Sequence, residues 1–302
     1  MAEKIKITFL GTSSAIPTAR RNHSATLLQY KNETILFDCG EGTQRQFRKA
    51  RISMGKITRI ILSHWHGDHV LGLPGLLQTM VMNGYNRKLK IYGPRGSKNK
   101  VRAYIDLFGI DSKKLDLEVH EVREEIFFDN GDFYLEAKDM DHGAPTNGYS
   151  FVIREKNRLD KKKLSKLKLP QSSLISELVK GKTIKIGGKK IDGRKLLYKE
   201  ASRKFSIVID SRYNDNAIRL AKGANLFVCE ASFSKDEENI ARDYGHMTSN
   251  DAAKIANKAK AQTLALVHLS QRYDAIPKKI LKEAKETFKE VFIPEDLDEI
   301  VL

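Results

Sequence analysis

The stretch His64-Trp65-His66-Gly67-Asp68-His69 decides how the rest of this chain is interpreted. It places three imidazoles and a carboxylate within six positions, and these groups are common protein ligands of zinc. No helix would place all four side chains on one face, because residues one or two apart point in different directions. The preceding residues 57–63 are mostly apolar and β-branched, which predicts a buried strand that leads into the loop. The sequence therefore predicts a two-metal site at the end of a strand.

Other ligand-type side chains stand where predicted strands end. Asp210 follows the apolar run 205–209, and His268 follows the apolar run 263–267. A buried carboxylate at the end of such a strand is costly unless it is paired or bound to a metal. His142 lies in a short connection between two predicted strands. Because α/β sheets gather strand ends at one edge, these three side chains are candidates for the same site.

The predicted strands and helices alternate in a similar order in the two halves of the chain. Apolar or alternating runs predict strands, and helical periodicity of apolar residues predicts helices. The predicted strands of the first half are residues 4–10, 24–30, 34–38, 57–63, 89–92, 115–128 and 133–138, and its predicted helices are residues 44–51, 73–82 and 99–108. Strands and helices alternate again after residue 204. By itself the pattern establishes a mixed α/β protein.

Nearly all of the excess positive charge lies in one segment, residues 154–204. The chain of 302 residues has a formal net charge of +16, and this segment holds 18 Lys and Arg against 5 Asp and Glu. It contains Lys161-Lys162-Lys163, a predicted helix at 172–180 and a predicted hairpin at 182–190. Polyanions, above all nucleic acids, are the natural partners of such a segment. We expect an extended basic arm without a core of its own, inserted into a single domain of residues 1–302.

The overall composition restricts the class of protein. With 40% hydrophobic residues, a chain of this length can bury a sizeable core. No run approaches the roughly 18 apolar residues of a membrane span, and the first residues lead directly into a strand without a signal-peptide pattern. Two cysteines, Cys39 and Cys229, are too few for a disulfide framework. We therefore expect a cytoplasmic protein that does not bind membranes.

Several motifs resemble those of one family. The pattern His-x-His-x-Asp-His of the loop resembles the signature of the metallo-β-lactamase superfamily, whose members are hydrolases with one or two zinc ions. The flanking motifs are more specific, and they resemble the ribonuclease Z family of tRNA 3′-processing endonucleases. These motifs are Phe9 to Thr18 with Arg21-Asn22, Phe37 to Gln44, Gly72 to Gly75, Glu230 to Ser232, His246 to Thr248 and His268 to Tyr273. The resemblance covers nearly the whole chain.

The resemblance implies a four-layer αββα metallo-β-lactamase sandwich that holds two zinc ions between the edges of its sheets. It assigns one zinc to His64, His66, His142 and Asp210, and the other to Asp68, His69, Asp210 and His268. Asp210 would bridge the two ions. Imidazole-rich coordination of this kind suits zinc. Two ligand carboxylates against two divalent cations leave a positive site, which attracts a phosphodiester.

The resemblance also implies a reaction, the removal of the 3′ trailer from precursor tRNA by metal-hydroxide attack, which leaves a 3′-hydroxyl on the tRNA. Asp68 would accept the proton of the water, and His246, oriented by Glu230, would protonate the leaving oxygen. The segment 154–204 takes the place of the family's tRNA-gripping arm, and the family pattern suggests a homodimer whose arms each serve the partner's site. The expected substrate contacts come from Arg21, Asn22, Lys161, Lys162 and Lys163.

Two other classes of function share part of these features. A small-molecule hydrolase of the same fold, such as a phosphodiesterase or lactonase, would have the metals but no use for so basic an arm. A non-catalytic RNA-binding protein would keep the arm and could lose ligands, yet none of the expected ligands is missing. An assay that compares cleavage of a precursor tRNA with hydrolysis of a small phosphodiester would distinguish the tRNA endonuclease from these two classes.

Overall fold

The computed structural model describes residues 3–166, 174–186 and 189–302, and two seven-stranded sheets form its centre. In the first sheet the strand order is β18 (Glu299–Val301), β1 (Lys6–Gly11), β2 (Ala25–Tyr30), β3 (Glu33–Phe37), β4 (Arg59–Ile61), β5 (Lys88–Gly93) and β6 (Asp116–Glu121). The strands β3 to β6 run parallel, and the others are antiparallel to their neighbours.

The second sheet repeats this arrangement with the other half of the chain. Its strand order is β17 (Val291–Phe292), β16 (Leu264–Val267), β15 (Leu226–Glu230), β14 (Arg203–Val208), β9 (Pro145–Ile153), β8 (Phe133–Asp141) and β7 (Glu125–Asp129). Here β14 to β17 are the parallel strands. Parallel strands need crossover connections, so each half of the chain also carries helices.

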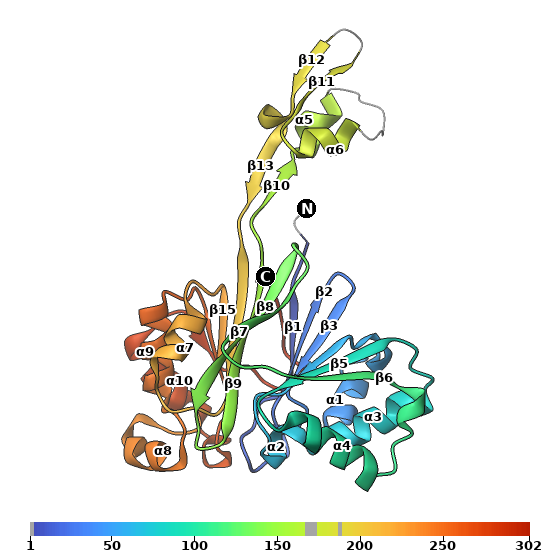
Figure 1. Cartoon of the computed structure of the whole chain (residues 1–302). Coiled ribbons are helices and arrows are strands. Elements are labelled where there is room, and N and C mark those ends of the chain that lie inside the picture. The colour runs from blue at the N-terminus through green and yellow to red at the C-terminus, as the bar shows by residue number, and fades with distance from the viewer. Residues whose placement is uncertain (1–2, 167–173, 187–188) are drawn as a thin grey trace.

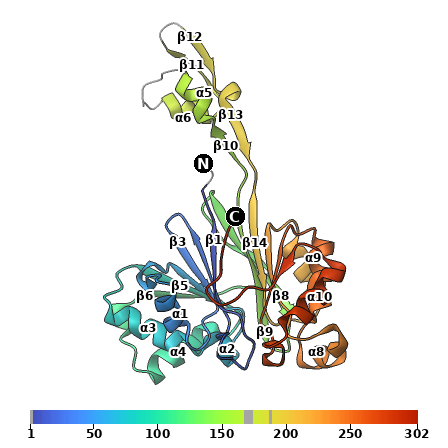
Figure 2. The ribbon, with the colours of Figure 1, turned by 180° about the vertical axis from the view of Figure 1, so that it is seen from behind.

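Helices cover the outer face of each sheet (Figures 1 and 2). The first sheet is flanked by α1 (Thr43–Lys49), α2 (Gly67–Val70), α3 (Leu73–Met82) and α4 (Ser97–Leu107). The second is flanked by α7 (Asp215–Ala221), α8 (Glu238–Tyr244), α9 (Ser249–Ala259) and α10 (Pro277–Thr287). Short 3-10 turns occupy Met54–Lys56, Ser112–Lys114, Gly193–Leu196, Lys235–Glu237 and Gln271–Tyr273. The predicted αββα sandwich is confirmed. None of the helices described is long and apolar enough to cross a membrane.

Three apolar clusters hold the layers together. The central cluster lies between the sheets and includes Phe9 and Phe37 from the first sheet with Phe151 and Phe205 from the second, all at most 3% exposed. Full burial of one such side chain contributes about 1.5–3 kcal/mol. Because the cluster contains side chains from both sheets, it is the main contact between the halves. The other two clusters pack each sheet against its own helices.

One predicted strand is wrong. Residues 115–128 were expected to form a single strand, but β6 ends at Glu121 in the first sheet and β7 begins at Glu125 in the second. Val122 lies between them and is buried in the central cluster, while Arg123 is exposed. The chain therefore crosses from one sheet to the other where a run of charged residues interrupts the apolar pattern.

The basic segment projects from the second sheet (Figure 1). The chain leaves at the end of β9 and returns at the start of β14, through a ribbon of β10 (Lys156–Leu159) and β13 (Leu197–Glu200). Beyond the ribbon lie α5 (Lys161–Lys166), α6 (Leu174–Val179) and a hairpin of β11 (Thr183–Ile186) and β12 (Lys189–Asp192). The hairpin agrees with the sequence pattern, whereas residues 172 and 173 of the predicted helix lie outside the described residues.

The arm has a small core, contrary to the expectation from composition. Leu178, Ile184 and Leu196 are buried together at its centre. Leu159, Leu164 and Ile191 pack against them. The sequence does not show this cluster clearly, because its apolar residues are far apart along the chain and lie among many lysines. The end of the arm is therefore a small folded unit on a two-stranded stalk.

Candidate metal centre

Strand ends with an unusual backbone bring the candidate ligands together. Asp210 follows β14 and His268 follows β16, and both have a left-handed backbone, with φ of 58° and 56°. Asp38 follows β3 with φ of 57°. Side chains other than glycine rarely adopt this conformation, and it occurs most often where a site requires it. In each case it turns the chain sharply as it leaves the sheet edge.

The histidine loop begins beyond β4. His64 and His66 lie in an irregular stretch, and the one-turn helix α2 carries Asp68 and His69. The predicted loop is thus half loop and half helix. His64 and His69 are fully buried, whereas His66 is exposed, so part of the loop is open to solvent.

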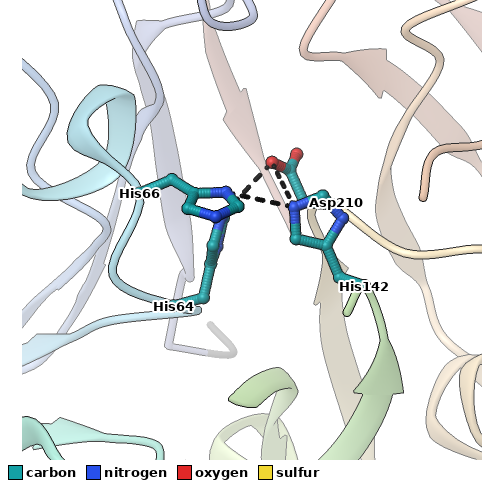
Figure 3. A group of neighbouring side chains, drawn as sticks. All are labelled: His64, His66, His142 and Asp210. Atoms are coloured by element: carbon teal, nitrogen blue, oxygen red, sulfur yellow. Dashed lines mark hydrogen bonds and ion pairs between the residues drawn. The ribbon is translucent and has the colours of Figure 1, made fainter. Parts of the chain in front are cut away.

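The first group of donors consists of His64, His66, His142 and Asp210 (Figure 3). The Nε2 atom of His64 lies 3.4 Å from Oδ2 of Asp210, and the Nε2 atom of His142 lies 3.6 Å from the same oxygen. The His142 Nε2 and His66 Nδ1 atoms are 3.2 Å apart. Three imidazoles and a carboxylate that converge in this way match the ligand types of a tetrahedral zinc site.

The second group consists of Asp68, His69, Asp210 and His268. The Nε2 atom of His69 lies 3.1 Å from Oδ2 of Asp68 and 3.3 Å from Oδ2 of Asp210. The Nε2 atom of His268 lies 3.2 Å from Oδ2 of Asp68. Asp210 belongs to both groups, as expected for a bridging carboxylate. All seven predicted ligands are thus brought together in the two predicted sets.

Unpaired buried atoms fit metal binding. Among the described residues, His64 Nε2, His69 Nε2 and Asp210 Oδ1 are buried and have no hydrogen-bond partner. A buried polar atom without a partner costs roughly 1–3 kcal/mol, so three in one place require a compensating ligand. With neutral imidazoles and an ionised carboxylate, each of these atoms could offer a lone pair, and two metal ions would satisfy them.

The electrostatics of the cluster also suit cations. Burial lowers the pKa of His64 well below its usual value, with a further decrease from the neighbouring His69. The neutral imidazole is the form that binds a metal. His69 differs, because burial lowers its pKa but the carboxylates of Asp210, Asp38 and Asp68 raise it well above the usual value. A bound cation would take over the role of that proton among the three carboxylates.

Asp38 supports the site from outside the ligand sets. Its Oδ2 lies 2.8 Å from His69 Nδ1 and accepts a hydrogen bond from the Ser63 hydroxyl, and its Oδ1 accepts one from the Ser63 N–H. A carboxylate on the far nitrogen fixes the ring of a metal-binding histidine. This role was not predicted from the sequence, although an acidic residue after an apolar strand was the same signal that identified Asp210.

Asp38→Asn should lower metal affinity roughly 10–100-fold, because an amide is a weaker acceptor for the His69 ring. Metal affinity is measured by titration against a chelator of known affinity. The matched control is Glu283→Gln, which alters another buried carboxylate that accepts three hydrogen bonds away from the two donor groups. Unchanged affinity in Asp38→Asn would show that Asp38 does not orient His69.

A third group contains Glu230 and His246 with Asp210 and His268. Glu230 is fully buried, and its Oε1 accepts a hydrogen bond from the N–H of Ser211. Its Oε2 lies 3.0 Å from His246 Nδ1 and accepts a second bond from a neighbouring serine hydroxyl. Because both of its carboxylate oxygens already accept hydrogen bonds, Glu230 is less suited than Asp210 to hold a metal.

The predicted acid His246 faces the cavity beside the cluster. Burial lowers its pKa, but the carboxylates of Glu230, Asp210 and Asp68 together outweigh this effect and raise it to about 9. Its Nε2 has no hydrogen-bond partner in the part of the chain that the structure describes. The arrangement gives a cationic imidazole with one N–H held by Glu230 and the other free for a substrate atom.

The predicted substrate contacts differ from one another in placement. Arg21 is 6% exposed, and its guanidinium donates to Thr12 Oγ1 and to the Pro294 carbonyl. The Asn22 amide donates to the Glu41 carbonyl. Both side chains therefore hold the opening loop in place. Lys163 is exposed on the arm, and Lys161 and Lys162 lie with it in α5.

Comparisons with known proteins agree with these features. Residues 5–162 match the family model described as "Anti-Pycsar protein Apyc1". The proteins named Ribonuclease Z of Natronomonas pharaonis and Archaeoglobus fulgidus are each 35% identical to this chain, and the matches cover 98% and 96% of it and 97% and 95% of those proteins. The Ribonuclease Z of Anoxybacillus flavithermus is 36% identical over 97% of this chain and 96% of its own length.

Solved structures show the same architecture. The crystal structure of human tRNase Z, short form (ELAC1), matches with a TM-score of 0.71 and 28% identity over 98% of both chains. The metallo-β-lactamase fold protein YhfI from Bacillus subtilis matches with a TM-score of 0.73 over all of both chains, and its 20% identity supports the fold alone. The chain therefore belongs, over residues 5–162, to the family of the matching model and, along nearly its whole length, to the ribonuclease Z family.

Proposed function

We propose that the chain removes the 3′ trailer of precursor tRNA as a zinc-dependent endoribonuclease and leaves a 3′-hydroxyl on the tRNA. Membership of the ribonuclease Z family makes it an endoribonuclease, a hydrolase of phosphodiester bonds. One observation carries the rest of the proposal. Residues from four separate parts of the sequence converge into two donor groups that share Asp210, beside a histidine that a buried carboxylate holds.

Two zinc ions fit the donor groups best. The first would be held by His64, His66, His142 and Asp210, and the second by Asp68, His69, Asp210 and His268. When bound, such ions supply Lewis acidity, which activates water and offsets the negative charge of the phosphodiester. The ligand sets contain only two carboxylates, so the loaded site keeps a positive charge that favours an anionic substrate.

Side chains of the protein then accept and donate the protons of the reaction. Asp68 lies at the edge of the second donor group, where its carboxylate can accept the proton that the attacking water loses. As the new P–O bond forms, the bond between phosphorus and the 3′ oxygen of the tRNA breaks, and its electron pair stays on that oxygen. His246 donates its free N–H proton to this oxygen, and Glu230 stabilises the imidazolium before transfer.

The arm supports a polynucleotide substrate. It stands well away from the metal cluster at the end of its stalk (Figures 1 and 2). Lys185, Lys190 and Lys195 are exposed, and their ammonium groups have no ion-pair partner among the described residues. We propose that these cations and those of α5 hold the body of the tRNA while its 3′ end reaches a metal site.

The distance between arm and site also bears on assembly. We propose a homodimer in which the arm of one subunit holds tRNA for the site of the other. The proposed place of action is the cytoplasm, where such a substrate would be processed. The direct test is to incubate the purified protein with a 3′-extended tRNA and map the new ends. The alternative, a small-molecule phosphodiesterase or lactonase, predicts hydrolysis of a small ester and no cut at the trailer.

His246→Ala should slow cleavage of precursor tRNA by roughly 10²–10⁴-fold with zinc content unchanged, because it removes a general acid and no ligand. A nitrophenyl phosphodiester, whose leaving group needs no proton, should lose far less. His120→Ala is the control, since this histidine lies outside the donor groups and stacks on Tyr92. Equal losses on both substrates, or a loss of zinc, would contradict the assignment of His246 as the acid.

A further inference from the structure

The cavity beside the metal cluster has an aromatic wall that the chemistry described so far does not use. The cavity has a volume of about 570 Å³, and its lining includes Phe233, Tyr244 and His246. The Phe233 ring lies 6.0 Å from the His246 ring and 6.4 Å from the Tyr244 ring, measured between centroids. The wall thus runs from the proposed acid outward to Tyr244.

Tyr244 presents a free aromatic face at the rim of this cavity. Its side chain is 70% exposed, and its hydroxyl has no hydrogen-bond partner among the residues described. An exposed ring gains little for folding stability, because most of its apolar surface stays in water. Its plane lies within 14° of the Phe233 plane, and Phe233 is only 8% exposed. The exposed ring is therefore nearly parallel to a buried one.

The backbone couples Tyr244 to the acid. Tyr244 is the last residue of α8, and Gly245 follows with φ of 77°, a left-handed conformation that turns the chain toward His246. The Gly245 carbonyl accepts a hydrogen bond from Nδ1 of His142 at 2.8 Å. Three consecutive residues thus have three roles: Tyr244 supplies the exposed ring, Gly245 supports the candidate ligand His142, and His246 is the proposed proton donor. A group that contacts Tyr244 is held in a fixed relation to His246.

We infer that Tyr244 stacks on the base of the tRNA's 3′-terminal nucleotide, the nucleotide whose 3′ oxygen leaves, and that this contact positions the scissile bond. The inference rests on the proposed function. The leaving oxygen must lie at His246, so the sugar that carries it is on the same side of the cavity, and its base extends along the aromatic wall. The first trailer nucleotide is joined through the phosphate and lies on the opposite side of the bond.

The chemistry of the contact predicts its selectivity. Every base has a π face, so stacking on an aromatic ring tolerates all four bases, whereas a nucleotide without a base cannot stack. Tyr244 would therefore be a positioning residue, indifferent to the identity of the last base but dependent on its presence. A contact of this kind suits an enzyme whose substrates end in different nucleotides.

The test uses precursor tRNA with an abasic site either at the last tRNA nucleotide or at the first trailer nucleotide. With the unmodified precursor, Tyr244→Ala should lower kcat/KM roughly 5- to 150-fold, the change expected for loss of one base–aromatic stack. Tyr244→Phe should retain near wild-type kcat/KM, because it keeps the ring. The matched control is Phe108→Ala, which removes an aromatic side chain that is 48% exposed at the end of α4.

The abasic substrates decide which nucleotide Tyr244 contacts. On the substrate that lacks the last tRNA base, the wild type and Tyr244→Ala should cleave at the same reduced rate. On the substrate that lacks the first trailer base, the full effect of Tyr244→Ala should remain. If the effect of Tyr244→Ala disappears only with the trailer base missing, or is equal on all substrates, the inference is overturned. A wild-type protein that does not cleave the precursor would instead overturn the proposed function, and the inference with it.

A binding measurement separates stacking from a general structural role. The fluorescent base 2-aminopurine, placed at the last tRNA nucleotide, is quenched when it stacks. In the slow His246→Ala background the signal should fall on binding, and the additional Tyr244→Ala change should abolish the fall. Zinc content should stay equal in both proteins. Persistent quenching without the Tyr244 ring would overturn the inference.

Discussion

Asp210→Ala should reduce cleavage of precursor tRNA to the level of the uncatalysed control, the largest loss expected of any single substitution in this chain. The two oxygens of Asp210 lie within 3.6 Å of ring nitrogens of His64, His69, His142 and His268. Removal of the carboxylate takes a ligand from both donor groups at once and leaves the positive charges of two metals with one carboxylate fewer. We expect zinc content to fall together with the rate.

His66→Ala removes a ligand from one donor group, whereas Asp210→Ala removes the ligand that both groups share. His66 belongs to the first donor group only and is exposed, so its loss should abolish cleavage while the second group still retains metal. Asp111→Ala is the control, since it removes an exposed carboxylate outside every donor group. Zinc is measured by atomic emission after gel filtration, and cleavage with a 3′-extended tRNA. Full activity of metal-stripped Asp210→Ala would rule out the binuclear mechanism.

The ligand cluster was predictable because its signals are local. Asp210 and His268 each follow a short apolar strand, and parallel strands place such residues at one edge of a sheet. The division into two sandwich halves came from the resemblance, because periodicity shows that a segment is a strand but not which sheet it joins. Residues 115–128 illustrate the difference, since their pattern predicts strand for both β6 and β7 but does not show that the two belong to different sheets.

Contacts between distant segments could not be predicted from the sequence. The role of Asp38 depends on a 2.8 Å approach to His69 across the site, and that approach depends on how β3 and β4 pair. Arg21 is predicted to contact substrate, and the sequence gives no sign that its guanidinium also donates to the Pro294 carbonyl near the other end of the chain. In both cases the partner is supplied by tertiary packing.

Replacement of Arg158 to Lys199 by a short linker should remove tRNA affinity without disturbing the site. The ends of the deletion lie on adjacent strands, since Asn157 pairs with Lys199 and Lys156 with Glu200, so a few residues can close the gap. The six apolar side chains that form the core of the arm among the described residues all fall between Leu159 and Leu196, so the deletion removes them together. No part of that cluster is left exposed to promote aggregation.

Salt dependence identifies the cause of the lost affinity. Each phosphate contact releases counterions and adds about 0.7–0.9 to the slope of log K against log salt. If four or five cations of the arm contact phosphate, the deletion should flatten this slope by roughly three to four units. A small phosphodiester is too short to reach the arm, so its hydrolysis should be unchanged.

A milder variant keeps the arm but changes its charge. Lys185, Lys190 and Lys195 are exposed without ion-pair partners in the described part of the chain, so their replacement by glutamine should leave the arm folded. If all three contact phosphate, the slope should flatten by about two to three units, most of the effect of the deletion. A deletion that weakens binding without a change in slope would mean that the arm acts through shape. Unaltered affinity and slope in both variants would refute its role in tRNA binding.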